Sequence, residues 1–191
     1  RIDLSTGMTQ QYAYPLTNIG SAAKPKYPTV SDIVAIDDHE FLLDERDGKG
    51  LGDDSSAVFK QINRIDLTGA QDVTGLSGEA NLASKAVAKT LFLDVVAMLN
   101  AHGIASQDIP AKLEGLAFGP DVVTQGVTRH TLDLSNDNDF LGTITDSNHP
   151  TGIDNSNKFF VFAIDVSALP NFAQQRAVDP EDQDDDADDA N

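Results

Sequence analysis

A short strand-end motif recurs three times along the chain, and this repeat limits the possible folds more than any other feature. Residues 1–7, 64–70 and 163–169 each read as an alternating apolar stretch that runs into a turn of small or hydroxyl-bearing residues. This pattern is typical of a strand that leaves a sheet. The repeat therefore predicts a β-rich chain in which similar units follow one another.

The stretches between these motifs also share their order. Each contains an apolar strand, a second strand that ends in acids, and a third strand that carries the motif. The first unit comprises residues 33–36, 41–47 and 58–67, and the second comprises residues 113–118, 131–140 and 159–166. Three consecutive strands per unit are typical of propeller blades or of a repeated β-meander. We predict a mainly β fold with partial β-propeller-like blades, and an ordinary sandwich in which short strands look alike is the alternative.

A closed propeller has at least about four blades, whereas the sequence supplies two units and the last strand of a third. The chain begins at Arg1, inside what reads as a strand. We therefore expect N-terminal blades of the same protein, or a second chain, to complete the ring. The predicted domain covers residues 1–172.

One helix is expected between the two units, within an insertion at about residues 81–103. An apolar stripe on residues 84–102 predicts it, and Gly103 is placed to end it. The stripe consists of Leu91, Phe92, Val95, Val96, Met98 and Leu99. We interpret it as cover for the sheet edge, with a partner or membrane helix as the alternative.

The net charge of the chain limits the kinds of partner that it is expected to bind. There are 31 acidic and 13 basic residues, which gives a net charge of −18. Binding to nucleic acid or to an anionic membrane is unfavourable for such a chain, because both need positive charge. No apolar run is long enough to span a bilayer, so no membrane insertion is expected. The surplus of acids fits an extracytoplasmic location, either periplasmic or secreted.

The last residues, 173–191, form an acidic tail with eight carboxylates between Asp179 and Asp189. With so little apolar surface the tail is predicted to be disordered, and a tail that attracts calcium or a partner is the alternative. The chain contains no cysteine, which excludes disulfides, thiol nucleophiles and thiolate metal ligands.

Two polar segments end the middle strands of the two units. In the first, the carboxylates of Asp44, Glu45 and Asp47 surround Arg46 before a glycine-rich turn; in the second, Asp137, Asn138 and Asp139 lie close together. Carboxylates suit a hard cation such as calcium, and an arginine suits an anionic oxygen beside it. Ordinary salt bridges at a strand end and a polar turn are the alternative interpretations.

A single acid also opens the first strand of each unit. Glu114 stands at the start of the apolar stretch 113–118, and Asp32 occupies the matching place in the first unit. Equivalent strand openings of neighbouring blades converge on one axis, so these acids are expected to share a polar channel with the two clusters. The alternative for Glu114 is a solvated residue at a strand start.

At these residues the sequence resembles the bacterial family named for the esterase-like activity of phytase. The resemblance spans about residues 28 to 166. It rests on residues 31–36, 41–48, 64–70, 113–121, 136–140 and 159–162, which occur in this order. The resemblance implies a β-propeller-like, usually exported hydrolase that acts on a small-molecule phosphoester or carboxylic ester. The usual N-terminal blades of the family are not present in this sequence.

The resemblance also implies a site at a channel mouth. Calcium would be held by Glu45, Asp47, Glu114, Asp137 and Asp139. Arg46 and Glu114 would be catalytic, and Arg46 and Asn138 would bind substrate. In this hypothesis calcium polarises the phosphoryl or carbonyl oxygen and activates water, while Arg46 steadies the negative charge. A non-catalytic extracellular propeller that binds calcium and a sugar-lactone hydrolase remain open as other functions.

Overall fold

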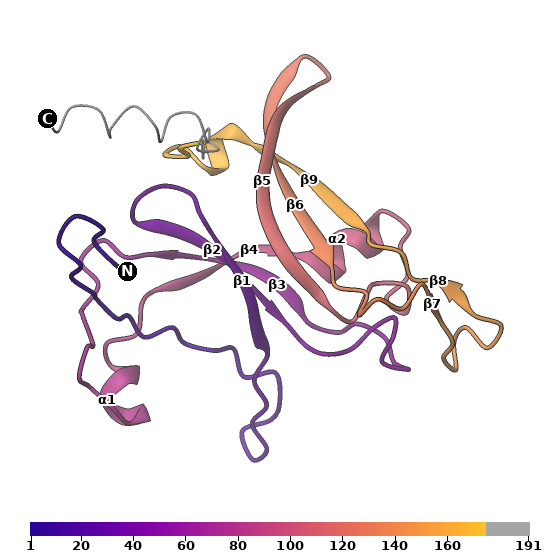
Figure 1. The fold of residues 1–191 in the computed structure, drawn as a ribbon, viewed down its shortest axis with the longest axis horizontal. Helices are drawn as coiled ribbons and strands as arrows, with labels where there is room; N and C mark the ends of the chain where they lie inside the picture. The colour runs from indigo at the N-terminus through magenta and orange to yellow at the C-terminus, as the bar shows by residue number, and fades with distance from the viewer. Residues whose placement is uncertain (175–191) are drawn as a thin grey trace, which may run out of the picture.

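The computed structural model of the chain describes residues 1–174 and consists of two antiparallel sheets with a small hairpin (Figure 1). The first sheet runs in the order β1 (Thr29–Ala35), β2 (Glu40–Arg46), β3 (Lys60–Asp66) and β4 (Lys89–Asp94). The second contains β5 (Leu113–Thr124), β6 (Val127–Asn136) and β9 (Phe159–Asp165). The hairpin pairs β7 (Thr143–Ile144) with β8 (Ile153–Asp154).

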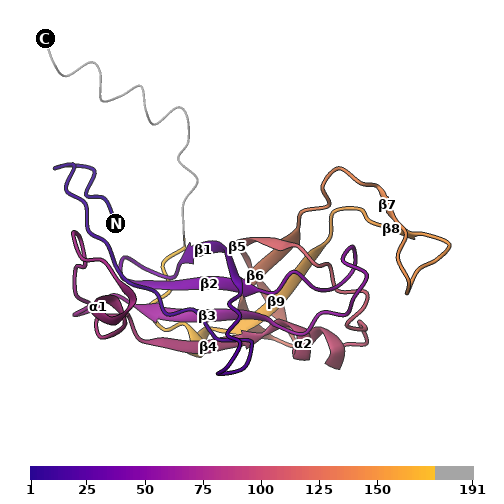
Figure 2. The same cartoon turned by 90° about the horizontal axis from the view of Figure 1, so that it is seen from below.

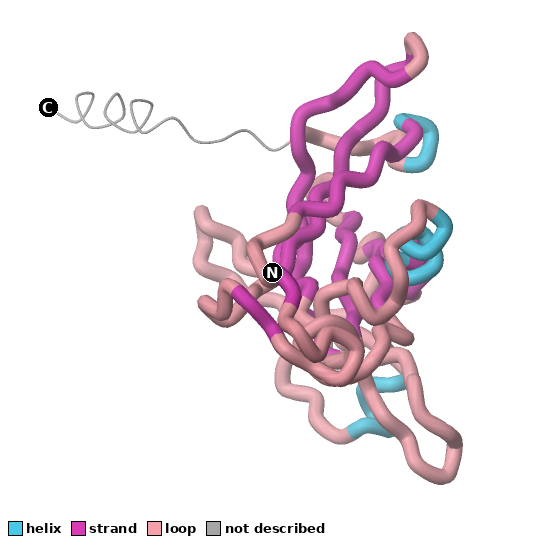
Figure 3. Tube along the Cα trace, turned by 90° about the vertical axis from the view of Figure 1, so that its right-hand side faces the viewer, coloured by secondary structure: helices cyan, strands magenta, loops and turns pink. Residues whose placement is uncertain are grey.

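The helices are short and lie at the margins of the strands (Figure 3). They are α1 (Glu79–Ala83), α2 (Val95–Ala101) and a 3-10 turn at Val166–Ala168. Neither α-helix in the described part of the chain has the length and apolar character needed to cross a bilayer.

One apolar core joins the two sheets. Successive residues of a strand face opposite sides of the sheet, and the inward positions of β2, β3 and β6 carry branched aliphatic side chains. Leu42, Ile62, Leu132 and Leu134 are all fully buried in one cluster. A hydrogen bond also joins the two sheets: the backbone N–H of Leu116 in β5 donates to Asp32 Oδ2 in β1 at 2.7 Å.

The N-terminal segment covers the other face of the first sheet. A smaller cluster forms there from Leu43, Ile65 and Val87, with Tyr12 and Tyr14 packed against it. Backbone bonds fasten the segment, as when the N–H of Val87 donates to the carbonyl of Ala13 at 2.9 Å. The first sheet is therefore buried on both faces over part of its length.

The mainly β prediction is confirmed, and the six predicted strands correspond in order to β1, β2, β3, β5, β6 and β9. Each sheet is an antiparallel meander, with the β7–β8 hairpin projecting from the second sheet between β6 and β9 (Figure 2). Within residues 1–174 the sheets close no barrel or ring. An arrangement of blades around an axis stays a prediction.

The predicted helix over residues 84–102 is largely wrong. Residues 89–94 form β4, which extends the first sheet by pairing with β3, and only Val95–Ala101 is helical within that range. The run of apolar residues fitted a helical stripe, but Leu91 lies opposite Asn63 and Leu93 lies opposite Ile62 in the antiparallel ladder with β3. Asp94 then starts α2, because its side chain accepts a hydrogen bond from the N–H of Ala97 at 2.9 Å.

The prediction of a strand end at residues 1–7 is also wrong. These residues belong to a local turn that makes a single bridge between Ile2 and Thr9 and joins neither sheet. Asp3 explains the turn, since its carboxylate accepts the N–H of Ser5 at 2.9 Å. The predicted strand over 131–140 begins and ends four residues earlier than expected, at Val127 and Asn136. The acidic-tail prediction concerns residues 173–191, of which 175–191 lie outside the described part of the chain.

Candidate functional site

Two residues that the sequence singles out meet between the sheets. Arg46 ends β2 and Glu114 opens β5, and Arg46 Nη2 donates to Glu114 Oε1. Arg46 Nε donates to Ser31 Oγ in β1 at 2.8 Å, and the Arg46 side chain is only 11% exposed. This pair fixes the end of β2 against the start of β5.

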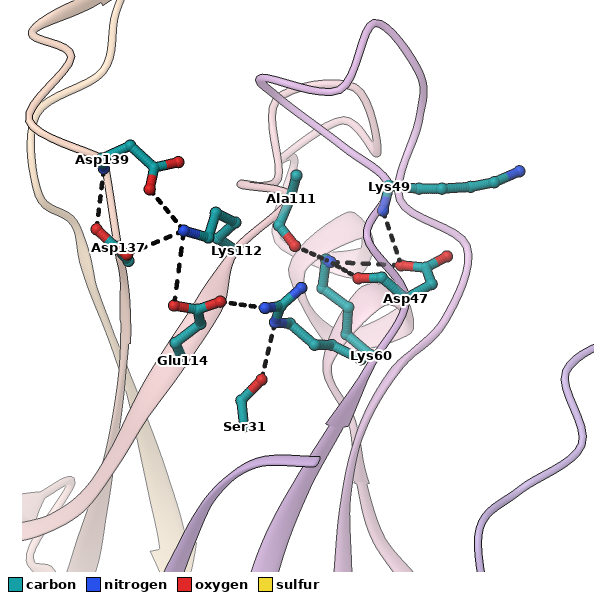
Figure 4. A network of polar contacts seen from close by, with 10 residues as sticks. Ser31, Asp47, Lys49, Lys60, Ala111, Lys112, Glu114, Asp137 and Asp139 are labelled. Atoms are coloured by element: carbon teal, nitrogen blue, oxygen red, sulfur yellow. Dashed lines mark hydrogen bonds and ion pairs between the residues drawn. The ribbon is translucent and has the colours of Figure 1, made fainter. Parts of the chain in front are cut away.

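Lys112, just before β5, joins the second polar segment to this pair. Its ammonium donates to Asp139 Oδ1 at 2.6 Å and to Asp137 Oδ2 at 3.0 Å, and lies 4.0 Å from Glu114 Oε2. Figure 4 shows Glu114 between Lys112 and the guanidinium that is bonded to Ser31. Three carboxylates and two cationic side chains thus form one continuous ion-pair cluster, which we call the Lys112 cluster: Arg46, Lys112, Glu114, Asp137 and Asp139.

The turn after β6 holds its two aspartates by backbone bonds. The N–H of Asp137 donates to the carbonyl of Lys112 at 3.0 Å, and the N–H of Asp139 donates to Asp137 Oδ1 at 2.9 Å. Asp139 and Phe140 have φ values of 51° and 60°, in the left-handed region that few side chains adopt. Asn138 donates from Nδ2 to the carbonyl of Asn155 at 3.0 Å. These bonds fix the backbone of the turn, and the bond from the N–H of Asp139 also holds the Asp137 carboxylate.

A cavity of about 280 Å³ lies beside this turn. Lys112, Asp137, Asn138 and Asp139 form its charged and polar side. Its other lining residues are Leu51, Gly52, Pro110, Ala111, Leu141, Thr143, Ile144, Thr145 and Asn155. The β7–β8 hairpin thus supplies part of the wall, while Arg46 and Glu114 lie behind Lys112 and outside the lining.

Asp47 lies next to the cluster in sequence but pairs with a different cation. Lys60, which is fully buried, donates from Nζ to the Asp47 carbonyl at 3.2 Å, to Asp47 Oδ1 at 3.4 Å and to the carbonyl of Ala111 at 2.9 Å. Burial lowers the pKa of Lys60, against the opposing effect of Asp47. Because Ala111 precedes Lys112, this buried lysine ties the loop after β2 to the segment that carries the cluster.

Glu45 is not brought together with the other predicted residues. It points to the opposite face of β2, where Thr17 donates to its Oε2 at 2.7 Å and Lys89 donates to its Oε1 at 2.8 Å. The period of two along a strand explains this, because Arg46 and Glu45 are neighbours in sequence and must face opposite sides. The fully buried Glu45 helps to fasten the N-terminal segment to the first sheet.

Asp44 belongs to the first polar segment, but the sequence analysis gave it no role as a metal ligand, catalytic residue or substrate-binding residue. It is 0% exposed, and neither carboxylate oxygen has a hydrogen-bond partner among residues 1–174. Burial raises its pKa to about 7, although Arg46 and Lys60 act in the opposite direction. The spacing of the residues could have predicted this burial. Asp44 lies two residues after Leu42 and therefore shares the inward face of β2 with it.

Sequence reasoning missed Lys112, which lies at the centre of the cluster. Its hydrogen bonds to Asp139 and Asp137 raise its pKa, so it is fully charged at neutral pH. The pKa of Asp137 is lowered by the N–H of Asp139 and by Lys112. The available signal was a lone basic residue directly before a predicted strand opening in a chain with few cations.

The predicted calcium ligands do not fit a calcium ion in this arrangement. Their oxygens suit such an ion, but Glu45 faces away, Asp47 is bound to Lys60, and the Lys112 ammonium lies among the remaining three carboxylates. Elsewhere in residues 1–174, Asp37, Asp38 and His39 place ligand atoms within 4.8 Å of one another, in the turn between β1 and β2. Asp37 already accepts the N–H groups of His39 and Glu40 there.

The comparison with family models agrees with the resemblance seen in the sequence. The phytase-like family, described as esterase-like activity of phytase, matches residues 1–140. The chain belongs to this family. The matched region of the phytase-like chain includes the first sheet, β5, β6 and the whole Lys112 cluster, and ends before the β7–β8 hairpin and β9. No curated protein and no solved structure has significant similarity to the chain.

Proposed function

We propose that this phytase-like chain hydrolyses a small phosphoester or carboxylic ester at the cavity beside the Lys112 cluster. One observation carries the proposal: a lysine and two carboxylates from the predicted site line the same cavity. Family membership supports a hydrolase-like function. The acidic composition and the family resemblance support an extracytoplasmic location, which we also propose.

Ester hydrolysis needs a group that stabilises negative charge on oxygen and a group that takes a proton from water. Lys112 would donate to the phosphoryl or carbonyl oxygen as it gains charge. Asp137 or Asp139 would accept a proton from the attacking water, and the same proton would pass to the leaving alkoxide when its bond breaks. Glu114 and Arg46, which lie behind Lys112, would position the ammonium rather than touch substrate.

The test is an assay of the full chain with p-nitrophenyl phosphate and p-nitrophenyl acetate, each in EDTA and in calcium. Lys112→Met and Asp139→Asn should each lower kcat/KM by about a hundredfold or more, the scale for removing one electrostatic stabiliser. Lys85→Met is the control, because Lys85 bonds to Gln71 and neither residue lines the cavity. Turnover that both cavity variants retain would refute the site, and no turnover of either ester would count against hydrolysis.

A non-catalytic role is the second candidate, and the pairing within the cluster favours it. Each of the three carboxylates already faces a cation, as expected if the cluster only cross-links the two sheets. In that case Lys112→Met lowers the melting temperature while no ester is hydrolysed by either protein. Measuring both quantities on the same preparations separates the two candidates.

A further inference from the structure

The charge balance of the Lys112 cluster suggests what occupies it. Glu114, Asp137 and Asp139 contribute −3, and Lys112 and Arg46 contribute +2, which leaves −1. We infer that the Lys112 ammonium is the resident cation of these three carboxylates and takes the place of a divalent metal ion. The wild-type cluster then binds no calcium, and a variant without the ammonium becomes a calcium site.

The position of the ammonium supports this inference. Lys112 Nζ reaches carboxylates on two separate segments, one at the start of β5 and one in the turn after β6, at 4.0, 3.0 and 2.6 Å. A metal ion would have to displace it from all three. The cavity beside the cluster, of about 280 Å³, provides room for the waters that calcium keeps when protein ligands are few.

The backbone of the turn that carries Asp137 and Asp139 keeps its place without the lysine side chain. Asp137 is held through its backbone N–H by the backbone carbonyl of residue 112, and Asp139 is held by its own N–H on Asp137. Asn155 fastens the same turn by donating from Nδ2 to the carbonyl of Leu141 at 2.9 Å. A methionine at position 112 preserves these backbone bonds and leaves the cluster at −2, which one calcium ion would neutralise.

The experiment is a calorimetric titration of the full chain with calcium chloride alone, on the wild type, Lys112→Met and Lys112→Arg. We expect no saturable binding at the cluster in the wild type or in Lys112→Arg. Lys112→Met should gain one site with a Kd between about 10 μM and 1 mM, within the range of calcium sites in proteins. The melting temperature of Lys112→Met should be lower in EDTA than in calcium, whereas that of the wild type should be equal in both.

Other acids of the chain also attract calcium. The double variant Asp137→Asn, Asp139→Asn therefore shows whether calcium binds at the Lys112 cluster. Added to Lys112→Met, this pair of changes should remove the new site. The inference is overturned if the wild type binds calcium and the same pair abolishes that binding, or if folded Lys112→Met gains no site. If Lys112→Met does not fold, calcium binding by the wild type with and without Asp137→Asn and Asp139→Asn still tests the inference. Because metal binding is measured directly, a chain that hydrolyses no ester still gives a clear result.

Discussion

Asp44→Asn should make the folded chain more stable, by an amount that depends on pH. Asp44 is fully buried in β2 and has no hydrogen-bond partner in the described part of the chain, so its ionised form is poorly solvated. Asparagine has nearly the same shape and carries no charge. The change therefore removes the cost of ionising this side chain and leaves the core volume almost unchanged.

The size of the effect follows from the pKa of Asp44, which rises from its ordinary value of 3.8 to about 7 on folding. Between these values the unfolded chain loses the proton while the folded chain keeps it, so the stability of the wild type falls as pH rises. Each unit of pKa difference corresponds to about 1.4 kcal/mol, and the window from 3.8 to 7 gives about 4 kcal/mol. Above pH 7 both states are ionised and the penalty is constant.

Urea unfolding from pH 4 to pH 8 measures this directly. The difference in free energy of unfolding between Asp44→Asn and the wild type should grow steadily up to about pH 7 and then level off. Asp38→Asn is the control, because Asp38 is exposed and its bond to His39 lowers its pKa. A difference between Asp44→Asn and the wild type that does not change with pH would refute the assigned burial of this carboxylate.

Two further predictions concern the groups that hold the site in place. Lys60→Met should lower the free energy of unfolding by about 3 kcal/mol in urea, because Asp47 loses its buried partner, and an unchanged value would contradict that pairing. The imidazole of His149 bonds to Asp108 and Asp146 at 2.9 Å each. Burial acts to lower its pKa, but these two bonds outweigh burial and raise the pKa above the ordinary value of 6.5. The stabilisation that the protonated His149 gives to the folded state is therefore complete below pH 6.5, and it is lost as pH rises through the folded pKa of His149. Hydrogen exchange of the β7–β8 amides, corrected for the intrinsic pH dependence, should show less protection at pH 9 than at pH 6, and His149→Asn should remove this difference.

The sequence predicted the strands well because their signals are local. Short apolar or alternating stretches bounded by turn residues mark β2 and β6 without reference to the rest of the chain. The stretch over residues 89–94 failed because its apolar run fits a helix and a strand equally, and pairing with β3 decides between them. That pairing is a long-range contact, which a local pattern does not contain.

The candidate site was predicted in part for the same reason. Asp137 and Asp139 were found because clustered acids after a strand are visible in the sequence, and both line the cavity. Glu45 was misplaced because the grouping by proximity in sequence ignored the alternation of β2. Lys112 was missed because its partners come from other segments, and only the folded arrangement brings them to its ammonium.

The hairpin wall of the cavity divides the site between two stretches of chain. The charged side belongs to the region that the family model matches, and the side formed by Thr143, Ile144 and Asn155 lies beyond it. The hairpin meets the charged side mainly through the bonds of Asn155 to the turn after β6. Exchange of the loop between β7 and β8 would therefore reshape the cavity and leave intact the ion pairs that hold the sheets together.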